Sequence, residues 1–179
     1  MRSDLARRLA GYVPVDESET ESVRLIRRLL AVPAAFSSEF FEPGHVTASA
    51  FVVHPGSDAV ALLLHSKIGR WLQPGGHVEP GDGSVVAAAL REVREEIGAG
   101  AANEPWLCDV DVHVFPARND VPRHLHHDVR VAFVADTTEL VIGDGADDVR
   151  WWSFDEALTL EESIARPVRK LAEWRQRHN

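Results

Sequence analysis

Three glutamates at helical spacing are the residues of this chain best suited to metal-assisted chemistry. Glu92, Glu95 and Glu96 follow a segment, Pro74–Gly83, that contains four glycines and two prolines. Carboxylates three and four positions apart on a helix repel one another by roughly 0.2–0.5 kcal/mol per pair. A divalent cation would remove that repulsion, because hard cations bind carboxylate and carbonyl oxygens. The alternative is a solvated helix on which neighbouring arginines pair with the glutamates.

Apolar spacing indicates how this helix is held. Four side chains separated by four, three and four positions form one stripe that would pack on a sheet: Val86, Leu90, Val93 and Ile97. Ser84 and Asp82 are the candidate N-caps, and Gly98 is the expected end of the helix.

The turn and the helix together resemble the Nudix box. The shared pattern is a glycine pair, a downstream acidic residue, and then Arg-Glu-apolar-x-Glu-Glu-apolar-Gly, which runs here from Gly76 to Gly98. The second half matches at every defined position. Asp82 stands where the family has Glu, and one extra residue separates it from Arg91. Weaker similarity extends from about Val46 to Leu158.

The resemblance implies an α/β fold, a Nudix-like α/β/α sandwich around a mixed sheet. We assign residues 45–179 to the Nudix hydrolase domain and residues 1–44 to an N-terminal helical extension packed on it.

The resemblance also implies the chemistry: a hydrolase that cleaves a phosphoanhydride (pyrophosphate) bond by attack of water on phosphorus. The expected substrate is a nucleoside diphosphate derivative or a nucleoside triphosphate. The implied ligands of Mg²⁺ (or Mn²⁺) are Glu92, Glu95, Glu96 and the carbonyl oxygen of Gly75. Arg91 would orient the glutamates through a charge-assisted hydrogen bond.

Glu92 is our candidate for the general base, so that Glu92, Arg91 and Glu95 form the expected catalytic set. Family members differ over whether the base comes from the helix or from a distant loop. Glu139 and the acidic run Asp144–Asp148 are the loop alternatives in this chain.

A second group of polar residues lies on a predicted strand. His124, His126, Asp128 and Arg130 are two positions apart and would therefore share one face, with Val129, Val131 and Phe133 on the other. That face would contact the substrate, hold Zn²⁺ or be solvated, since His and Asp suit all three. Residues expected to contact the substrate are Gln73, His77, His126, Asp128 and Arg130. By contrast, His45, His54 and His65 are isolated on strands and are expected to be structural.

The remaining helices and strands are predicted from the spacing of apolar residues and from the prolines and glycines that interrupt it. We expect helix up to about residue 35 with a capping box at Ser18–Glu21, and a hairpin of 45–54 and 59–65. Further strands are expected at 71–73, 106–115, 126–135 and 149–154, with a long turn at 74–83. Helices at 155–158 and 160–178 follow, the second containing Pro167.

Composition limits the partners. The formal net charge of −9 over 179 residues argues against a broad nucleic-acid-binding surface, so a small phosphorylated molecule is the expected partner. The first residues lack the apolar core of a signal peptide and no run is long enough to span a membrane, which predicts a cytoplasmic protein. The apolar faces of the terminal helices would either pack on the domain or form a homodimer.

Two other functions compete with the hydrolase. One is a catalytically silent Nudix-fold module that senses a nucleotide, although such a module would not need three crowded carboxylates. The other is an isoprenoid diphosphate isomerase, which shares the fold and uses a catalytic cysteine. Cys108 is the single cysteine here, and its strand context predicts a buried, inert thiol.

Overall fold

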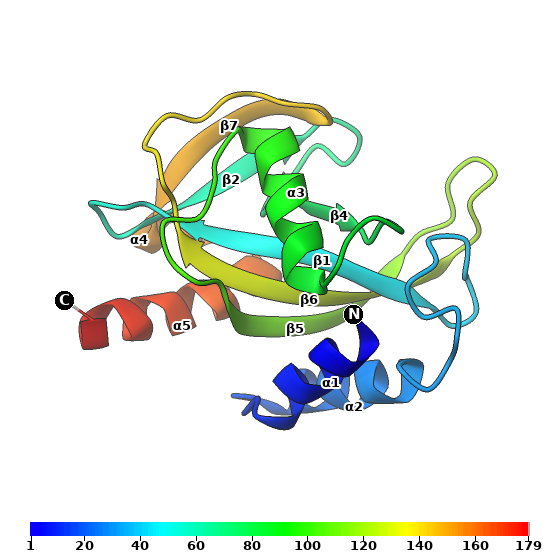
Figure 1. Cartoon of the computed structure of the whole chain (residues 1–179). Helices are drawn as coiled ribbons and strands as arrows, with labels where there is room; N and C mark the ends of the chain where they lie inside the picture. Colours follow the sequence, from blue (N-terminus) through cyan, green and yellow to red (C-terminus); the bar gives the residue numbers. More distant parts are fainter. Residues whose placement is uncertain (179) are drawn as a thin grey trace.

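The computed structural model describes residues 1–178 and contains one mixed sheet between helices (Figure 1). The helices are α1 (Arg2–Ala10), α2 (Glu17–Leu29), α3 (Val85–Ile97), α4 (Phe154–Ala157) and α5 (Glu162–His178). The strands are β1 (Gly44–Val53), β2 (Ala59–His65), β3 (Trp71–Leu72), β4 (Gly75–His77), β5 (Trp106–Phe115), β6 (His124–Val134) and β7 (Ala146–Ser153).

Strand β1 is the centre of the sheet. The order along the sheet is β3-β2-β1-β6-β5, with β4 added to β1 and β7 added to β2. Strands β1 and β6 run parallel, with Gly44 opposite Leu125 and Val53 opposite Val134, whereas β2 and β4 pair with β1 antiparallel. The mixed sheet is therefore confirmed.

The two faces of the sheet carry separate apolar cores because strand side chains alternate. Even-numbered residues of β1, such as Val46 and Val52, pack with α1, α2 and α3, and odd-numbered ones, such as Phe51 and Val53, pack with α4 and α5. Helices α3 and α5 thus lie on opposite faces (Figure 1), which confirms the sandwich.

Two local expectations were wrong. Asp16, not Ser18, caps α2, because its Oδ1 accepts the Glu19 N–H at 2.7 Å. The segment expected to be one long turn contains β4, whose two glycines can approach β1 closely. No local pattern identified β4, because three residues are too few to show alternation.

The terminal helices bury their apolar faces within the chain. Leu5 and Leu9 of α1 are fully buried, as are Ile164 and Val168 of α5. Among the residues that the structure describes, no helix is both long and apolar enough to cross a membrane.

We expect Leu9→Ala to lower the free energy of unfolding by about 2–5 kcal/mol, because it leaves a cavity in the core shared by α1, α2 and the sheet. All tryptophans lie after residue 70, so tryptophan fluorescence during denaturation reports on the sheet and its C-terminal helices. Val13→Ala, at a side chain that is 79% exposed, is the control. An unchanged fluorescence transition in Leu9→Ala would mean that the N-terminal helices fold independently.

Candidate active site

Helix α3 presents the three glutamates at the edge formed by β4. Ser84 is the N-cap, since its Oγ accepts the Ala87 N–H at 3.1 Å, and Gly98 ends the helix in the left-handed conformation at φ 71°. Val93 and Ile97 are fully buried against the sheet, as the apolar stripe predicted.

The glycine pair allows the glutamates to approach the backbone of β4. Glu96 Oε2 accepts the Gly75 N–H at 2.9 Å. A Cβ at Gly76 would lie 2.5 Å from Glu92 Oε1, and one at Gly75 would lie 2.3 Å from Ser49 Cβ. Only glycine fits at either position without displacing a neighbour.

Arg91 links the glutamates to the turn. Its Nη1 donates to Glu92 Oε1 at 2.9 Å and to Glu95 Oε2 at 3.0 Å, and its Nη2 donates to the carbonyl oxygen of His77 at 2.9 Å. Asp82 binds the other side of the guanidinium, with Arg91 Nε at 3.3 Å from Oδ1 and Nη2 at 3.2 Å from Oδ2.

Asp82 therefore holds Arg91 despite the shorter side chain and the inserted residue. Burial alone would raise the pKa of Asp82, but the hydrogen bonds from Arg91 and from the Glu79 N–H hold it below its ordinary value. These bonds fix the guanidinium between the turn and the helix. The sequence left this role in doubt, because the loop path between residues 82 and 91 cannot be deduced from spacing.

The electrostatics of the cluster fit a divalent cation. Burial raises the pKa of Glu96 to about 7, against the hydrogen bond from Gly75, and the charges of Glu92 and Glu95 add to the rise. Burial likewise raises the pKa of Glu92, while Arg91 lowers it. Among the described residues, Arg91 pairs with Glu92 and Glu95, and no cation pairs with Glu96. Carboxylate oxygens left without a full counter-charge are ligands that suit Mg²⁺ or Mn²⁺.

The acidic loop named as a source of the base lies next to this cluster. The Gly143 N–H donates to the carbonyl oxygen of Glu96 at 2.9 Å, and the Val141 N–H donates to that of Ile97 at 3.1 Å. The nearest atom to a Cβ at Gly145 would be Glu96 Oε1, at 3.9 Å. Residues 144–148 thus flank the glutamates, although the sequence places them about 50 positions away.

The polar strand β6 has the face that its alternation predicted. Asp128 Oδ2 accepts Arg130 Nε at 2.8 Å and the Ser49 hydroxyl at 2.8 Å, and Asp128 Oδ1 accepts the Thr47 hydroxyl at 3.0 Å. Gln73 Nε2 lies 3.4 Å from the same carboxylate, and Gln73 Oε1 is buried without a hydrogen-bond partner in the described part of the chain.

Arg130 is 2% exposed and lies in an ionic network that the sequence did not reveal. Its Nη1 contacts Asp109 Oδ2 at 3.2 Å and its Nη2 contacts Asp111 Oδ2 at 3.2 Å. Nη1 also donates to the carbonyl oxygen of Ser163 at 2.9 Å, which is free because Pro167, four residues on, has no N–H. The charged atoms of Arg130 and Asp128 are thus bound by protein groups.

Five histidines gather at the other end of the same face: His45, His77, His113, His124 and His126. Burial lowers the pKa of His45 to about 4 and that of His126 to about 2, with nearby histidines adding to both effects. These imidazoles are therefore neutral at pH 7. His45 was expected to be structural because it is isolated along its strand. Its position beside His126 comes from the register of β1 with β6, which the sequence does not show.

The comparison with family models gives one match, the NUDIX domain, over residues 43–174. The chain belongs to the Nudix family.

Solved structures with a similar fold include several Nudix proteins. A Nudix domain of Shewanella oneidensis NrtR complexed with ADP ribose is 18% identical, with a TM-score of 0.55 over 86% of this chain and 98% of that one. A C. elegans Ap4A hydrolase is 16% identical, with a TM-score of 0.54 over 73% and 97%. A MutT Nudix hydrolase from Burkholderia pseudomallei is 22% identical, with a TM-score of 0.53 over 70% and 96%.

With the glutamates of the Nudix box in place, the protein is a Nudix-type pyrophosphohydrolase. Cys108 is 6% exposed, and burial raises the pKa of its thiol far above the ordinary value. That environment is unsuited to a catalytic cysteine and counts against the isomerase.

We expect Gly76→Ala to lower kcat/KM on the order of 10–100-fold with little loss of stability, because the added methyl displaces the flexible Glu92 carboxylate. Gly81→Ala, in the same turn with no atom within 4 Å of the added Cβ, is the matched control. Initial rates and thermal melts of both variants test this. Equal rates for the two variants would contradict the placement of Glu92 beside the glycine pair.

Proposed function

We propose that this Nudix protein cleaves the pyrophosphate linkage of a nucleoside diphosphate derivative or nucleoside triphosphate in a Mg²⁺- or Mn²⁺-dependent reaction. The observation that carries this proposal is the convergence of Glu92 and Glu96 on the backbone of Gly75 and Gly76, with Arg91 bridging Glu92 and Glu95.

Glu92, Glu95, Glu96 and the carbonyl oxygen of Gly75 would hold the cation. When bound, it would neutralise phosphate oxygens and lower the pKa of a water molecule. Arg91 keeps two of the glutamates in place, because its guanidinium is itself fixed by Asp82 and the His77 carbonyl.

Glu92 accepts the proton of the attacking water in this proposal. The water oxygen forms the new bond to phosphorus, the anhydride P–O bond breaks, and the second phosphate group leaves with the bonding electrons. Two observations support Glu92 as the base: Arg91 holds one of its carboxylate oxygens, and its side chain is 15% exposed. An acid from residues 144–148 is the alternative base, since that loop flanks Glu96.

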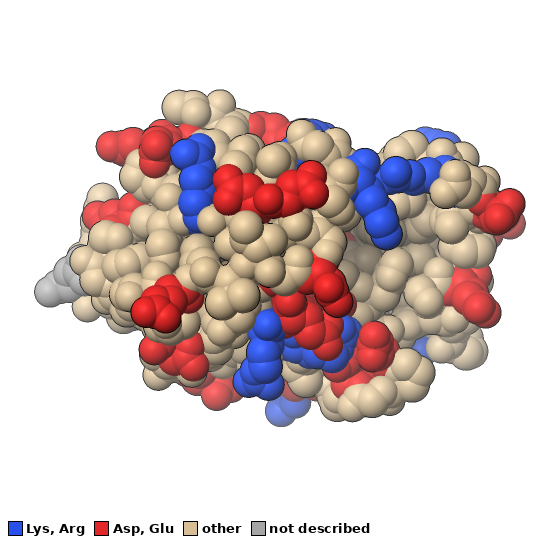
Figure 2. All heavy atoms as spheres, turned by 90° about the horizontal axis from the view of Figure 1, so that it is seen from above, with Lys and Arg blue, Asp and Glu red and all other residues tan. Residues whose placement is uncertain are grey.

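In this proposal the polar face of the sheet, on the side of α5, supplies the substrate contacts. Gln73 is the strongest of the proposed contacts, because its Oε1 has no hydrogen-bond partner among residues 1–178 and is able to accept one from an N–H or O–H group. Asp128 orients the side-chain amide of Gln73 by accepting its N–H, and Arg130 in turn holds Asp128. His77 and His126 lie further along the same face. On the face seen in Figure 2, basic side chains form small groups among acidic ones, which suits a small molecule rather than a nucleic-acid polymer.

The test is a release assay for phosphate and pyrophosphate with nucleoside triphosphates, nucleotide sugars, ADP-ribose and dinucleoside polyphosphates, each with Mg²⁺, Mn²⁺ or excess chelator. Turnover that the chelator abolishes supports the proposal and names the substrate class. Incorporation of ¹⁸O from labelled water then identifies the phosphorus attacked. Tight nucleotide binding without turnover across the panel would overturn it and favour a nucleotide-sensing module.

A further inference from the structure

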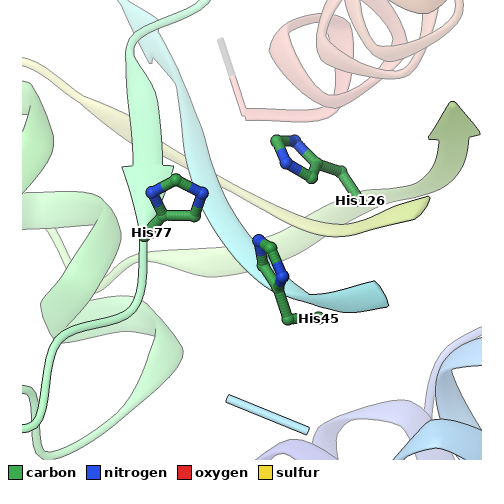
Figure 3. A group of neighbouring side chains, drawn as sticks. All are labelled: His45, His77 and His126. Carbon is green, nitrogen blue, oxygen red and sulfur yellow. The ribbon is translucent and has the colours of Figure 1, made fainter. Parts of the chain in front are cut away.

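Three histidines from three strands converge on one point outside the glutamate cluster. His45 of β1, His77 of β4 and His126 of β6 each place a ring nitrogen within 4.8 Å of the others, and their rings face a common space (Figure 3). Pairing in the sheet explains the convergence: His45 is opposite His126, and His77 is opposite Thr47, the next residue on the same face of β1.

The hydrogen bonds of His45 leave one nitrogen free to bind a ligand. Its Nδ1 lies 3.1 Å from the carbonyl oxygen of Phe40, which can only accept, so Nδ1 carries the proton. Nε2 therefore presents a lone pair, and it is buried without a hydrogen-bond partner among the residues that the structure describes, in a side chain that is 1% exposed. Histidines that bind metals are typically held in this way, by an N–H bond to a backbone carbonyl on the other nitrogen.

His126 is oriented by a chain of two hydrogen bonds. His124 Nδ1 donates to the carbonyl oxygen of Pro122 at 2.7 Å, and in the neutral ring this makes His124 Nε2 an acceptor. His126 Nε2 lies 3.0 Å from it and must be the donor, so the lone pair of His126 is on Nδ1. His124 is thus a positioning residue for His126.

We propose that His45, His77 and His126 bind a first-row transition-metal ion, foremost Zn²⁺, at a site distinct from the three glutamates. Neutral imidazole nitrogens suit Zn²⁺, whereas Mg²⁺ prefers the carboxylate oxygens of α3. The same sheet edge would then hold two metals of different chemistry.

The three ring nitrogens would have to move only slightly closer together to bind one ion. Zn–N bonds of about 2.0–2.1 Å in a tetrahedron place the nitrogens roughly 3.4 Å apart, and side-chain rotations can bring them together from their present separation. His45 is buried and His126 half-buried, but His77 is exposed. The fourth coordination position therefore faces solvent on the side of His77 and takes a water molecule or another oxygen ligand.

The site also has a structural consequence. The ligands lie at positions 45, 77 and 126, so one ion would cross-link β1, β4 and β6. Since His77 directly follows the glycine pair of β4, bound Zn²⁺ would hold the strand against which Glu92 and Glu96 rest.

The experiment is a Zn²⁺ titration of the full-length, metal-free protein in excess Mg²⁺, by competition with a chromophoric chelator. We expect one equivalent of Zn²⁺ to bind and to raise Tm, and X-ray absorption to show three nitrogens at about 2.0–2.1 Å. Binding should weaken at least about 100-fold in His45→Ala and His126→Ala and about 10–100-fold in His124→Ala.

Two controls separate this site from the others. His178→Ala, at an exposed residue of the last turn of α5, should bind Zn²⁺ like the wild type. The combined Glu92→Gln, Glu95→Gln and Glu96→Gln variant should lose hydrolysis but keep Zn²⁺. Loss of Zn²⁺ in that variant, unchanged binding in folded His45→Ala and His126→Ala, or no binding by the wild type would overturn the proposal. None of these readouts depends on the enzyme's turnover.

Discussion

Glu96→Gln lowers kcat by at least about 100-fold at saturating substrate, which is the largest effect on activity that we expect from a conservative change. The side chain keeps its shape, and the amide oxygen can still accept the Gly75 N–H that Glu96 Oε2 accepts at 2.9 Å. What is lost is one negative charge among three carboxylates, and with it part of the attraction for a divalent cation.

The measurement is the initial rate as a function of Mg²⁺ concentration, using the substrate found in the release assay. We expect a lower maximal rate and a higher metal concentration at half-saturation, with an unchanged thermal melt in the absence of metal. Glu104→Gln, at an exposed residue outside the site, is the matched control and should have the wild-type rate. A Glu96→Gln rate within about twofold of the wild type would remove Glu96 from the ligand set.

Asp109→Ala lowers the free energy of unfolding by about 3–5 kcal/mol, the largest effect on stability that we expect from a single substitution. Asp109 is 0% exposed. Its carboxylate accepts Arg166 Nε and Nη2, both at 2.9 Å, and Lys170 Nζ at 2.8 Å. It also accepts Arg130 Nη1 at 3.2 Å. Its removal leaves three cations in the protein interior short of a counter-charge. The expected decrease in the free energy of unfolding is a large part of the roughly 5–15 kcal/mol that stabilises a domain.

The same carboxylate makes stability depend on pH. Burial alone would raise the pKa of Asp109, but the hydrogen bond from Arg166 and the charges of Arg130 and Lys170 hold it below its ordinary value of 3.8. Burial alone would also raise the pKa of Asp111, but the hydrogen bond with His113 and the charges of Arg130 and Arg166 lower it to about 2. Because both are lowered on folding, their contribution is complete above the unfolded-state pKa and is lost as pH falls from about 4 towards 2.

Urea denaturation at pH 7 and at pH 3 tests both statements. The wild type should lose stability between these values, and the difference between wild type and Asp109→Ala should shrink at the lower pH. Asp120→Asn, at an exposed residue, should match the wild type at both. A loss below about 1 kcal/mol at pH 7 for Asp109→Ala would show that the network contributes little to folding.

The sequence by itself determined the features that repeat along one element. Helical spacing placed Glu92, Glu95 and Glu96 together, on a different face from the stripe that contains Val93 and Ile97, because a helix repeats every 3.6 residues. Two-residue alternation likewise placed the polar residues of β6 on one face, with Asp128 and Arg130 in contact. The Nudix resemblance rests on spacing within single segments, and such spacing does not depend on how the segments are arranged in space.

Only the tertiary structure decided which elements meet. The partners of Arg130 come from β5 and α5, and the loop beside Glu96 comes from residues about 50 positions away, so neither could be read from a window of sequence. The convergence of His45, His77 and His126 depends on β1 pairing parallel with β6 and antiparallel with β4. A shift of one residue in either register would send the side chains to the opposite face, and register is set by the packing of the whole sheet rather than by any one strand.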